Sequence, residues 1–316
     1  MRILIADSLD PRALESLKTL GFEVSETRTL GAGPAPGGAA AAEILIVRST
    51  LVPAALLPSL PALKLIIRAG AGTDTIDTAA AAARGIQVAN TPGRNADAVA
   101  EIALGLLLAA DRRIPDATRD LRSGRWTKAA LGLGMGLKGR TLGIVGLGAV
   151  GRCMARNAKG LGMEVLAWSG RLTPASAAEA GAGFAESLPD LARRSDAVSV
   201  HLASTPATRG LLGRDFFAAL RPGALFINTA RGEVVDRAAL LEAIRSKGVR
   251  AGLDVFAGEP KGGDAEFADT ELASMCVCTP HLGASTDQAA DAVADEVVRI
   301  ARVFRDTGRA PNAVLP

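Results

Sequence analysis

Short apolar runs of strand length alternate with longer Ala- and Leu-rich stretches through most of the chain. This alternation is typical of parallel strands joined by crossover helices, with the strands buried on both faces. The runs of the first ninety residues are RILIAD, EILIVRS, LKLIIRAG and IQVANT. A second series follows, with GRTLGIVGLGAVGR, MEVLAWS, AVSVHLA, ALFINTA, RAGLDVFA and CVCTP. Its six runs match the strand count of a doubly wound dinucleotide-binding fold.

The two series predict an α/β protein with two doubly wound domains, which the length of 316 residues also favours. Residues 1–95 plus 285–316 are expected to form a flavodoxin-like substrate-binding domain, and residues 96–284 an inserted Rossmann domain. Helices near 95–112 and 285–307, the second capped by Ser285 or Thr286, would be the hinges. Ligands are expected in the cleft between the domains. The segment 31–42, rich in Gly and Pro, predicts a surface loop.

Composition and charge exclude several classes of function. The chain has 36 Lys and Arg against 33 Asp and Glu, no block of five like charges and 3% aromatic residues. We therefore expect no nucleic-acid partner, while the mild basic excess suits a small anionic substrate. The longest apolar run, 102–110, is too short to span a membrane, and the N-terminus does not resemble a signal peptide.

Cysteine usage points to a reducing compartment. Cys153, Cys276 and Cys278 cannot form a full disulfide framework, and their spacing is not that of a metal knuckle. We expect buried thiols, no metal site and a cytoplasmic location.

The segment TLGIVGLGAVG places a G-x-G-x-x-G motif between a strand and a helix. Gly146 would allow the tight turn, Gly148 the approach of a pyrophosphate, and Gly151 close packing of helix on strand. The N–H groups at the helix start, around Ala149 and Val150, would bind the phosphates. In this setting the motif predicts NAD(H) or NADP(H) as cofactor.

The next strand lacks the acid that usually binds the ribose 2′-hydroxyl. It ends instead at Ser169, followed by Gly170 and Arg171. Ser169 and Arg171 could bind a 2′-phosphate, which would favour NADP(H). Alternatively, Ser169 serves a plain ribose and Arg171 faces solvent. The sequence leaves both readings open.

Three later strand ends carry the residues that hydride transfer to a 2-oxoacid requires. Arg231 can grip a carboxylate and polarise the carbonyl, His281 can supply the proton, and Glu259 can orient that imidazole. These strand-end segments also hold Thr229, Ala230 and Gly283, which we assign to the cofactor side. His201 either lines the adenine side or is a packed strand-end histidine.

NTARGEVVD, LDVFAGEP, TPHLGAST and GRTLGIVGLGAVG resemble the D-isomer-specific 2-hydroxyacid dehydrogenase family. The segment RAGAGTDTIDTAAAAARGIQVANTPGRNADAVAE is similar to the matching part of that family's first domain. Within the family the chain looks most like D-3-phosphoglycerate dehydrogenases, through VRST, TPHLGAST and SGRWTK. The sequence ends where the core ends, so the C-terminal regulatory domain of some of those enzymes is expected to be absent.

The resemblance implies roles for particular residues. Arg231 would bind the substrate carboxylate, Glu259 would pair with the acid/base His281, and Asp254 would face the nicotinamide carboxamide. In the first domain, the resemblance implies substrate contacts from the N–H groups of Gly70, Ala71 and Gly72. It implies further contacts from Asn95 at the first hinge and from Arg48 of VRST. The family also implies a homodimer joined through the nucleotide-binding domains.

One departure from the family pattern leaves the substrate open. Leu51 stands where phosphoglycerate enzymes tend to carry a basic residue, although Arg48, Arg125 and Lys128 remain as candidate phosphate contacts. The alternative within the family is a glyoxylate/hydroxypyruvate reductase. An alternative of another class is a nucleotide-sensing protein like the corepressors that share this fold. The sequence has no basic patch that would support this alternative.

Overall fold

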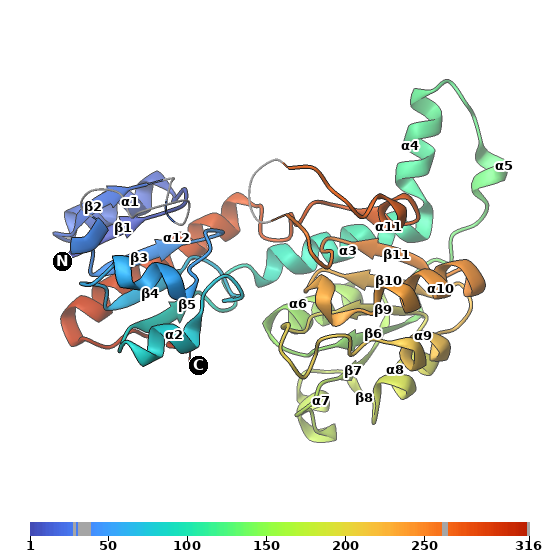
Figure 1. Cartoon of the computed structure of the whole chain (residues 1–316). Coiled ribbons are helices and arrows are strands. Elements are labelled where there is room, and N and C mark those ends of the chain that lie inside the picture. The colour runs from blue at the N-terminus through green and yellow to red at the C-terminus, as the bar shows by residue number, and fades with distance from the viewer. Residues whose placement is uncertain (28–29, 31–38, 261–264, 315–316) are drawn as a thin grey trace. The chain divides into compact units, whose positions relative to one another are not determined.

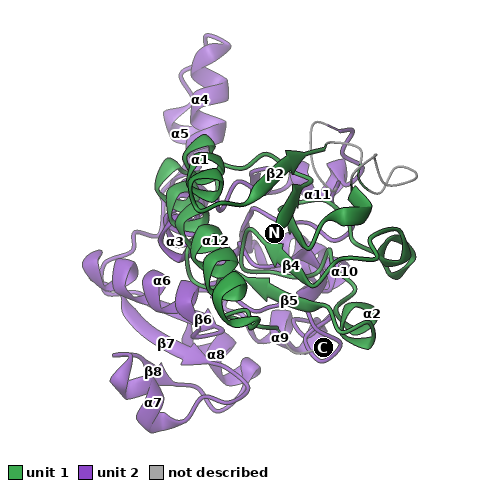
Figure 2. Cartoon of the chain, turned by 90° about the vertical axis from the view of Figure 1, so that its left-hand side faces the viewer, with its two compact units in different colours: residues 1–95, 261–264, 285–316 green, residues 96–260, 265–284 purple. Residues whose placement is uncertain are grey.

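A computed structural model of the chain describes residues 1–27, 30, 39–260 and 265–314. These residues divide into two compact units (Figure 2). The described residues of 1–95 and 285–316 form unit 1, and those of 96–260 and 265–284 form unit 2.

Within its described residues, unit 1 contains one parallel sheet of five strands in the order β2-β1-β3-β4-β5 (Figure 1). This is the flavodoxin-like order expected for a doubly wound fold, and the prediction of that fold class is confirmed. The strands are β1 (Arg2–Ile5), β2 (Glu23–Glu26), β3 (Ile44–Val47), β4 (Leu65–Arg68) and β5 (Gln87–Asn90). Its helical elements are α1 (Pro11–Thr19), η1 (Ala39–Ala41), η2 (Ala54–Ser59), α2 (Thr78–Ala83) and α12 (Asp287–Thr307).

Both faces of the unit 1 sheet are covered by apolar side chains. On one face, Ile3, Ile44 and Leu65 pack with Leu17 of α1 and Ile300 of α12. Neighbouring residues of the same strands face a second cluster with η2 and α2. Side chains alternate across a strand, so a continuous apolar run supplies both clusters at once. Helix α12 begins after Thr286, whose side chain accepts the Ala289 N–H at 3.1 Å.

Unit 2 holds a parallel sheet whose seven strands, in its described part, have the order β12-β11-β10-β9-β6-β7-β8. Counted from β6, this is the Rossmann order 3-2-1-4-5-6 with one further edge strand, so the order reverses between β6 and β9. The strands are β6 (Thr141–Val145), β7 (Glu164–Trp168), β8 (Gly183–Phe184), β9 (Ala197–Val200), β10 (Leu225–Asn228), β11 (Arg250–Leu253) and β12 (Val277–Cys278).

Helices on both faces of this sheet complete unit 2, while α4 and α5 extend away from it (Figure 1). Phe216 and Phe217 of α9 pack edge-to-face on Phe226 of β10 and anchor one face. The helical elements are α3 (Ala96–Arg112), α4 (Ile114–Arg122), α5 (Lys128–Leu131), α6 (Ala149–Gly160), α7 (Pro174–Glu179), α8 (Leu188–Arg194), α9 (Arg214–Ala219), η3 (Gly232–Val234), α10 (Arg237–Lys247) and α11 (Thr270–Ser274).

Several details differ from the sequence expectations. The strands β2 and β8 were not predicted, because β2 is a polar edge strand reading EVSE and β8 has only two residues. The thiols are less buried than expected: Cys153 and Cys276 are half-buried, and Cys278 is exposed because it lies on β12 at the sheet edge. Of the predicted loop 31–42, residues 31–38 lie outside the described residues.

The described residues include no candidate for a membrane span or a metal centre. No helix there is both long enough and apolar enough to cross a bilayer. In the same residues, no group of three or more His, Cys, Asp and Glu side chains could hold a metal ion.

Candidate functional site

The glycine motif forms the turn between β6 and α6. Gly146 has φ +98°, in the region that favours glycine, and its N–H donates to the Trp168 carbonyl at 2.8 Å. A Cβ at Gly146 would lie 2.5 Å from the His201 carbonyl oxygen, and one at Gly151 would lie 2.1 Å from the Gly146 carbonyl oxygen. Both positions therefore require glycine for folding.

Gly148 has a different role, because a Cβ there would meet no atom within 4 Å. It precedes α6, and no side chain caps the start of that helix. The first N–H groups of a helix have no partner within it, so those at Ala149, Val150 and Gly151 can bind an anion. The open space beside Gly148 and these N–H groups are suited to the pyrophosphate of a dinucleotide.

Ser169 and Arg171 follow β7, next to the glycine turn. The Leu172 N–H donates to the Ser169 carbonyl at 2.9 Å, which closes a turn around Gly170. Ser169 is half-buried, whereas Arg171 is exposed and has no ion pair within the described chain. The turn thus offers a hydroxyl and a guanidinium, and no carboxylate.

His201 and Thr229 lie at the ends of the neighbouring strands β9 and β10. The Nε2 atom of His201 is 2.9 Å from Ser199 Oγ, and burial lowers the pKa of His201 to about 3, so the ring is neutral. Its Nδ1 atom and Thr229 Oγ1 are buried, and neither has a hydrogen-bond partner among the described residues. Buried polar atoms are nearly always paired, so these two call for a ligand. Together with the open space at Gly148, they fit a dinucleotide.

Asn228 shapes the turn that carries Arg231. Its side chain accepts the Ala230 N–H and donates to the Arg231 carbonyl, both at 3.0 Å. The half-buried Arg231 side chain also donates through Nη1 to the Ala230 carbonyl at 2.6 Å. Asn228 itself is 1% exposed, so the base of this turn is rigid.

Asp254 holds the loop that carries His281. Its carboxylate accepts bonds from Thr279 Oγ1 at 2.6 Å, the Leu282 N–H at 2.7 Å and the Gly283 N–H at 2.9 Å. Burial raises the pKa of Asp254, and these three hydrogen bonds oppose that shift. The Asp254 carbonyl also accepts the His281 N–H at 2.8 Å.

Glu259 and His281 are hydrogen-bonded through Glu259 Oε1 and His281 Nδ1. The other oxygen, Oε2, accepts the Phe256 N–H at 2.9 Å. Burial would raise the pKa of Glu259, but the bonds from His281 and Phe256, with the nearby charge of Arg231, lower it overall. The carboxylate is therefore ionised at neutral pH, and His281, which is exposed, can use its Nε2 for proton transfer.

The candidates of the first domain lie in unit 1. Gly70 has φ +151°, Ala71 is exposed, and the N–H groups of Ala71 and Gly72 have no acceptor among the described residues. Asn95 is half-buried at the end of unit 1. Arg48 is exposed, and its side chain makes no ion pair within the described chain.

Residues 104–283 match the family model for the NAD-binding domain of D-isomer-specific 2-hydroxyacid dehydrogenases. The chain belongs to this family. It is 42% identical to D-3-phosphoglycerate dehydrogenase of Mycobacterium tuberculosis over 99% of its own length and 58% of the relative. The chain thus spans little more than half of the phosphoglycerate dehydrogenases that it matches.

Other relatives of this family member differ in their names. Glyoxylate reductase of Thermococcus litoralis is 39% identical over 82% of the chain and 79% of that protein. A solved NADPH-dependent glyoxylate/hydroxypyruvate reductase of Sinorhizobium meliloti, in complex with NADP and malonate, is 30% identical. It superposes with a TM-score of 0.82 over 99% of this chain and 96% of its own.

Sequence reasoning missed three residues that support the site. Asp7 Oδ2 accepts the N–H groups of Arg48, Ser49 and Thr50 at 2.6 to 3.1 Å and so fixes the loop after β3. Asn228 and Thr279 hold the segments that carry Arg231 and His281. All three follow or end strands, and that position was the available signal.

Proposed function

We propose that this dehydrogenase family member transfers a hydride between NAD(H) or NADP(H) and a D-2-hydroxyacid/2-oxoacid pair, as a D-3-phosphoglycerate dehydrogenase-like enzyme. The observation that carries the proposal is the hydrogen-bonded Glu259–His281 pair, with the charge of Arg231 close to Glu259. The 42% identity to a phosphoglycerate dehydrogenase supports the substrate class. Unit 1 would be the substrate-binding domain and unit 2 the dinucleotide-binding domain.

The chain's own groups then divide the chemistry. Arg231 binds the substrate carboxylate and polarises the neighbouring carbonyl. His281 donates a proton from Nε2 to the carbonyl oxygen in reduction and removes it from the hydroxyl in oxidation. The ionised Glu259 stabilises the imidazolium and keeps a proton on Nδ1. The bound nicotinamide supplies or accepts the hydride.

The geometry of unit 2 supports the proposed cofactor contacts. The start of α6, at Gly148, Ala149, Val150 and Gly151, would hold the pyrophosphate, and Ser169 and Arg171 the adenine ribose. The buried atoms of His201 and Thr229 would complete the pocket, with Ala230 and Gly283 beside it. Asp254 keeps one acceptor position beyond its three protein donors, which the carboxamide could use.

The substrate contacts would come from unit 1. The N–H groups of Gly70, Ala71 and Gly72, with Asn95, would bind the carboxylate, and Arg48 the far end of the substrate. The exposed Arg48 supports a phosphorylated substrate.

A glyoxylate/hydroxypyruvate reductase is the second candidate. The side chain of Leu51, which is 47% exposed, offers no charge for a phosphate. Arg171, which has no ion pair with any described residue, suits the 2′-phosphate of NADPH.

One assay separates the candidates. Both reduced cofactors are tested against phosphohydroxypyruvate, hydroxypyruvate, glyoxylate and pyruvate, and the oxidation of the cofactor is followed. Highest kcat/KM with phosphohydroxypyruvate is expected. Preference for glyoxylate or hydroxypyruvate would favour the reductase, and no turnover with any 2-oxoacid would favour a nucleotide-sensing protein.

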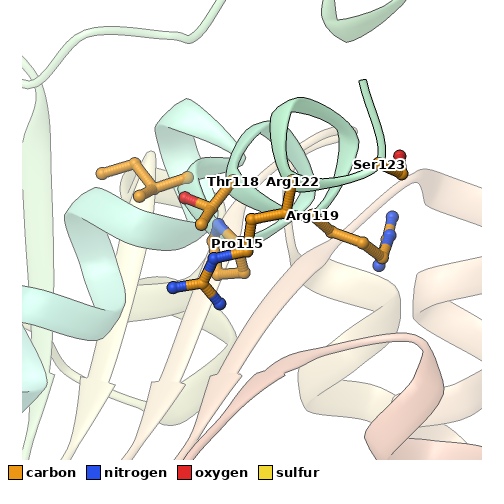
Figure 3. A pocket seen from close by; sticks show the side chains of 6 residues that line it. Pro115, Thr118, Arg119, Arg122 and Ser123 are labelled. Carbon is orange, nitrogen blue, oxygen red and sulfur yellow. The ribbon is translucent and has the colours of Figure 1, made fainter. Parts of the chain in front are cut away.

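We also infer a homodimer joined through unit 2. Helix α4 buries none of its residues, and a groove along it is lined by Ile114, Pro115, Thr118, Arg119, Arg122 and Ser123 (Figure 3). Leu121, Trp126 and Leu133 are also exposed, by 57%, 81% and 92%. So many exposed large apolar side chains in one segment favour an interface with a second copy.

Polar contacts keep this segment ordered before any partner binds. Asp120 accepts bonds from Thr127 Oγ1 at 2.6 Å and from Arg125. Asp111, 1% exposed, accepts the Met135 N–H at 2.6 Å. Light scattering should give a dimer for the wild type and a monomer for L121D/W126D; a monomeric wild type would refute this inference.

A cytoplasmic location is proposed on the three free thiols.

A further inference from the structure

The candidate substrate loop 70–72 is tied by two hydrogen bonds to the last residue of β5 and the residue that follows it. The Thr91 N–H donates to the Gly70 carbonyl at 3.1 Å, and Asn90 Nδ2 donates to the Ala71 carbonyl at 2.5 Å. In a trans peptide the C=O and N–H groups point in opposite directions. Fixing these two carbonyls therefore turns the N–H groups of Ala71 and Gly72 away from β5. Neither of these two N–H groups has an acceptor among the described residues.

Asn90 is in turn held by the C-terminal segment of the chain. Asn312 Nδ2 donates to the Asn90 carbonyl at 3.3 Å, and the Val314 N–H donates to the Val88 carbonyl at 2.8 Å. Ala313 pairs with Ala89 in an antiparallel bridge. The segment 312–314 thus covers the outer edge of β5, next to the residue that ties down Ala71.

Asn312 has a conformation that only a few residue types adopt easily. Its φ is +58°, in the left-handed region where asparagine is one of the better-tolerated non-glycine residues. The same Nδ2 atom donates to Glu296 Oε1 at 2.7 Å. Glu296 is 3% exposed and also binds Arg94 at 2.6 Å and Arg299 at 2.5 Å. Its carboxylate is a fixed anchor for the Asn312 amide.

We propose that Asn312 is a positioning residue that acts through Asn90 to aim the Ala71 and Gly72 N–H groups at the carboxylate of the substrate. This proposal rests on the proposed function. The contacts run within unit 1 from Glu296 to Asn312, from Asn312 to Asn90, and from Asn90 to Ala71. Loss of either amide would leave the loop in place but free to turn its peptides.

The test compares N312G and N90A with Q87A as a matched control. Glycine at position 312 keeps the positive φ and removes only the amide. Gln87 also ties β5 to the C-terminal segment, with bonds to Gly308 at 2.9 Å and Ala310 at 2.8 Å, but no bond to the loop 70–72 is made by its side chain. Q87A thus reports the stability cost of loosening the C-terminal segment.

For the preferred 2-oxoacid, N90A and N312G should each raise KM about tenfold, and the rise should be larger in N90A. The reason is that the charge-assisted bonds from the Ala71 and Gly72 N–H groups to the substrate carboxylate are weakened. The affinity for the reduced cofactor should stay at the wild-type value, and Q87A should keep the wild-type KM. The double variant N90A/N312G should be no worse than N90A, because Asn312 acts through Asn90.

A wild-type KM in N312G, an equal rise in Q87A or additive effects in the double variant would overturn the proposal. Wild-type turnover tests the proposed function separately. If the wild type turns over no 2-oxoacid, the proposed function fails. If Asn312 does not position the loop through Asn90, the wild type is active and only the KM values of the variants differ from those expected. Thermal unfolding checks that each variant folds, and N90D, which keeps the shape and loses the donor, replaces N90A where that variant does not.

Discussion

His281 is hydrogen-bonded through Nδ1 to Oε1 of Glu259. The histidine has φ +54°, and its N–H is held by the Asp254 carbonyl at 2.8 Å, so the backbone and the ring are both fixed. This arrangement leaves Nε2 as the only ring nitrogen of His281 that can exchange a proton with a substrate.

Replacing His281 by asparagine should nearly abolish turnover. Asparagine tolerates the positive φ at this position, so the loop should keep its conformation. Loss of the acid/base should lower kcat by about 10² to 10⁴-fold. Steady-state kinetics measure this, and fluorescence titration should give the wild-type affinity for the reduced cofactor. C278S, on the exposed end of β12, is the control and should keep wild-type rates; near-normal rates in H281N would exclude the catalytic assignment.

Replacing Glu259 by glutamine should change the pH profile as well as the rate. The bonds and charges around Glu259 lower its pKa, so the carboxylate is charged at neutral pH and stabilises a protonated His281. Protonation of Glu259 removes this charge, so the rate of reduction by the wild type should fall at acid pH, and the lowered pKa of Glu259 puts that fall below pH 4.5. Glutamine carries no charge at any pH, so E259Q should be slower at neutral pH and should lack this acid fall. Rate measurements from pH 3 to pH 9 test this, and the same acid fall in both enzymes would contradict it.

Replacing Arg171 by alanine should weaken NADPH more than NADH. The exposed guanidinium lies two residues beyond Ser169, where no carboxylate repels a 2′-phosphate. Loss of a charge-assisted pair should cost about tenfold or more in NADPH affinity. R193A, an exposed arginine on α8 of the same unit, is the control. Equal weakening of both cofactors in R171A would show that Arg171 does not contact the 2′-phosphate.

The sequence predicted the parts of the fold that depend on continuous apolar runs. The buried parallel strand β3 is apolar at every position and β10 at all but its last, so their existence could be read directly. The edge strand β2 could not, because its residues Glu23–Glu26 are mostly exposed and hold their place by pairing with β1. Edge pairing is a tertiary effect that leaves little trace in hydropathy.

The sequence also indicated the chemical groups of the site but not what holds them. The strand-end positions of Arg231, Glu259 and His281 were visible in the motifs. The supports are different, because Asn228 and Thr279 act through hydrogen bonds whose partners depend on the path of the loops. Asp7 lies 41 residues before Arg48, and only the pairing of β1 with β3 brings the two together.

The second and third glycines of the G-x-G-x-x-G motif should respond differently to alanine. In G151A the new Cβ would lie 2.1 Å from the Gly146 carbonyl oxygen, so the free energy of unfolding should fall by about 1 to 3 kcal/mol. In G148A the Cβ meets no atom within 4 Å, so stability should be unchanged while cofactor affinity falls at least tenfold. Urea unfolding and fluorescence titration test the pair. A destabilised G148A, or one with wild-type affinity, would contradict the assigned roles.

Replacing Glu296 by glutamine should destabilise the fold in a pH-dependent way. The bond to Arg299, with those to Asn312 and Arg94, lowers the pKa of Glu296 to about 2 against the opposing effect of burial. A carboxylate with a lowered pKa contributes stability that is present above its unfolded pKa, near 4.5, and lost as the pH falls towards 2. At pH 7, E296Q should therefore lower the free energy of unfolding by about 2 kcal/mol, less than a fully buried pair because both arginines are partly exposed. The difference in unfolding free energy between E296Q and the wild type should narrow between pH 4.5 and pH 3.

E271Q is the control, because Glu271 also binds two arginines but is half exposed. The loss of unfolding free energy in E271Q should therefore be much smaller. Equal losses of unfolding free energy in the two variants, or a loss in E296Q that does not depend on pH, would contradict the role assigned to the buried Glu296 carboxylate.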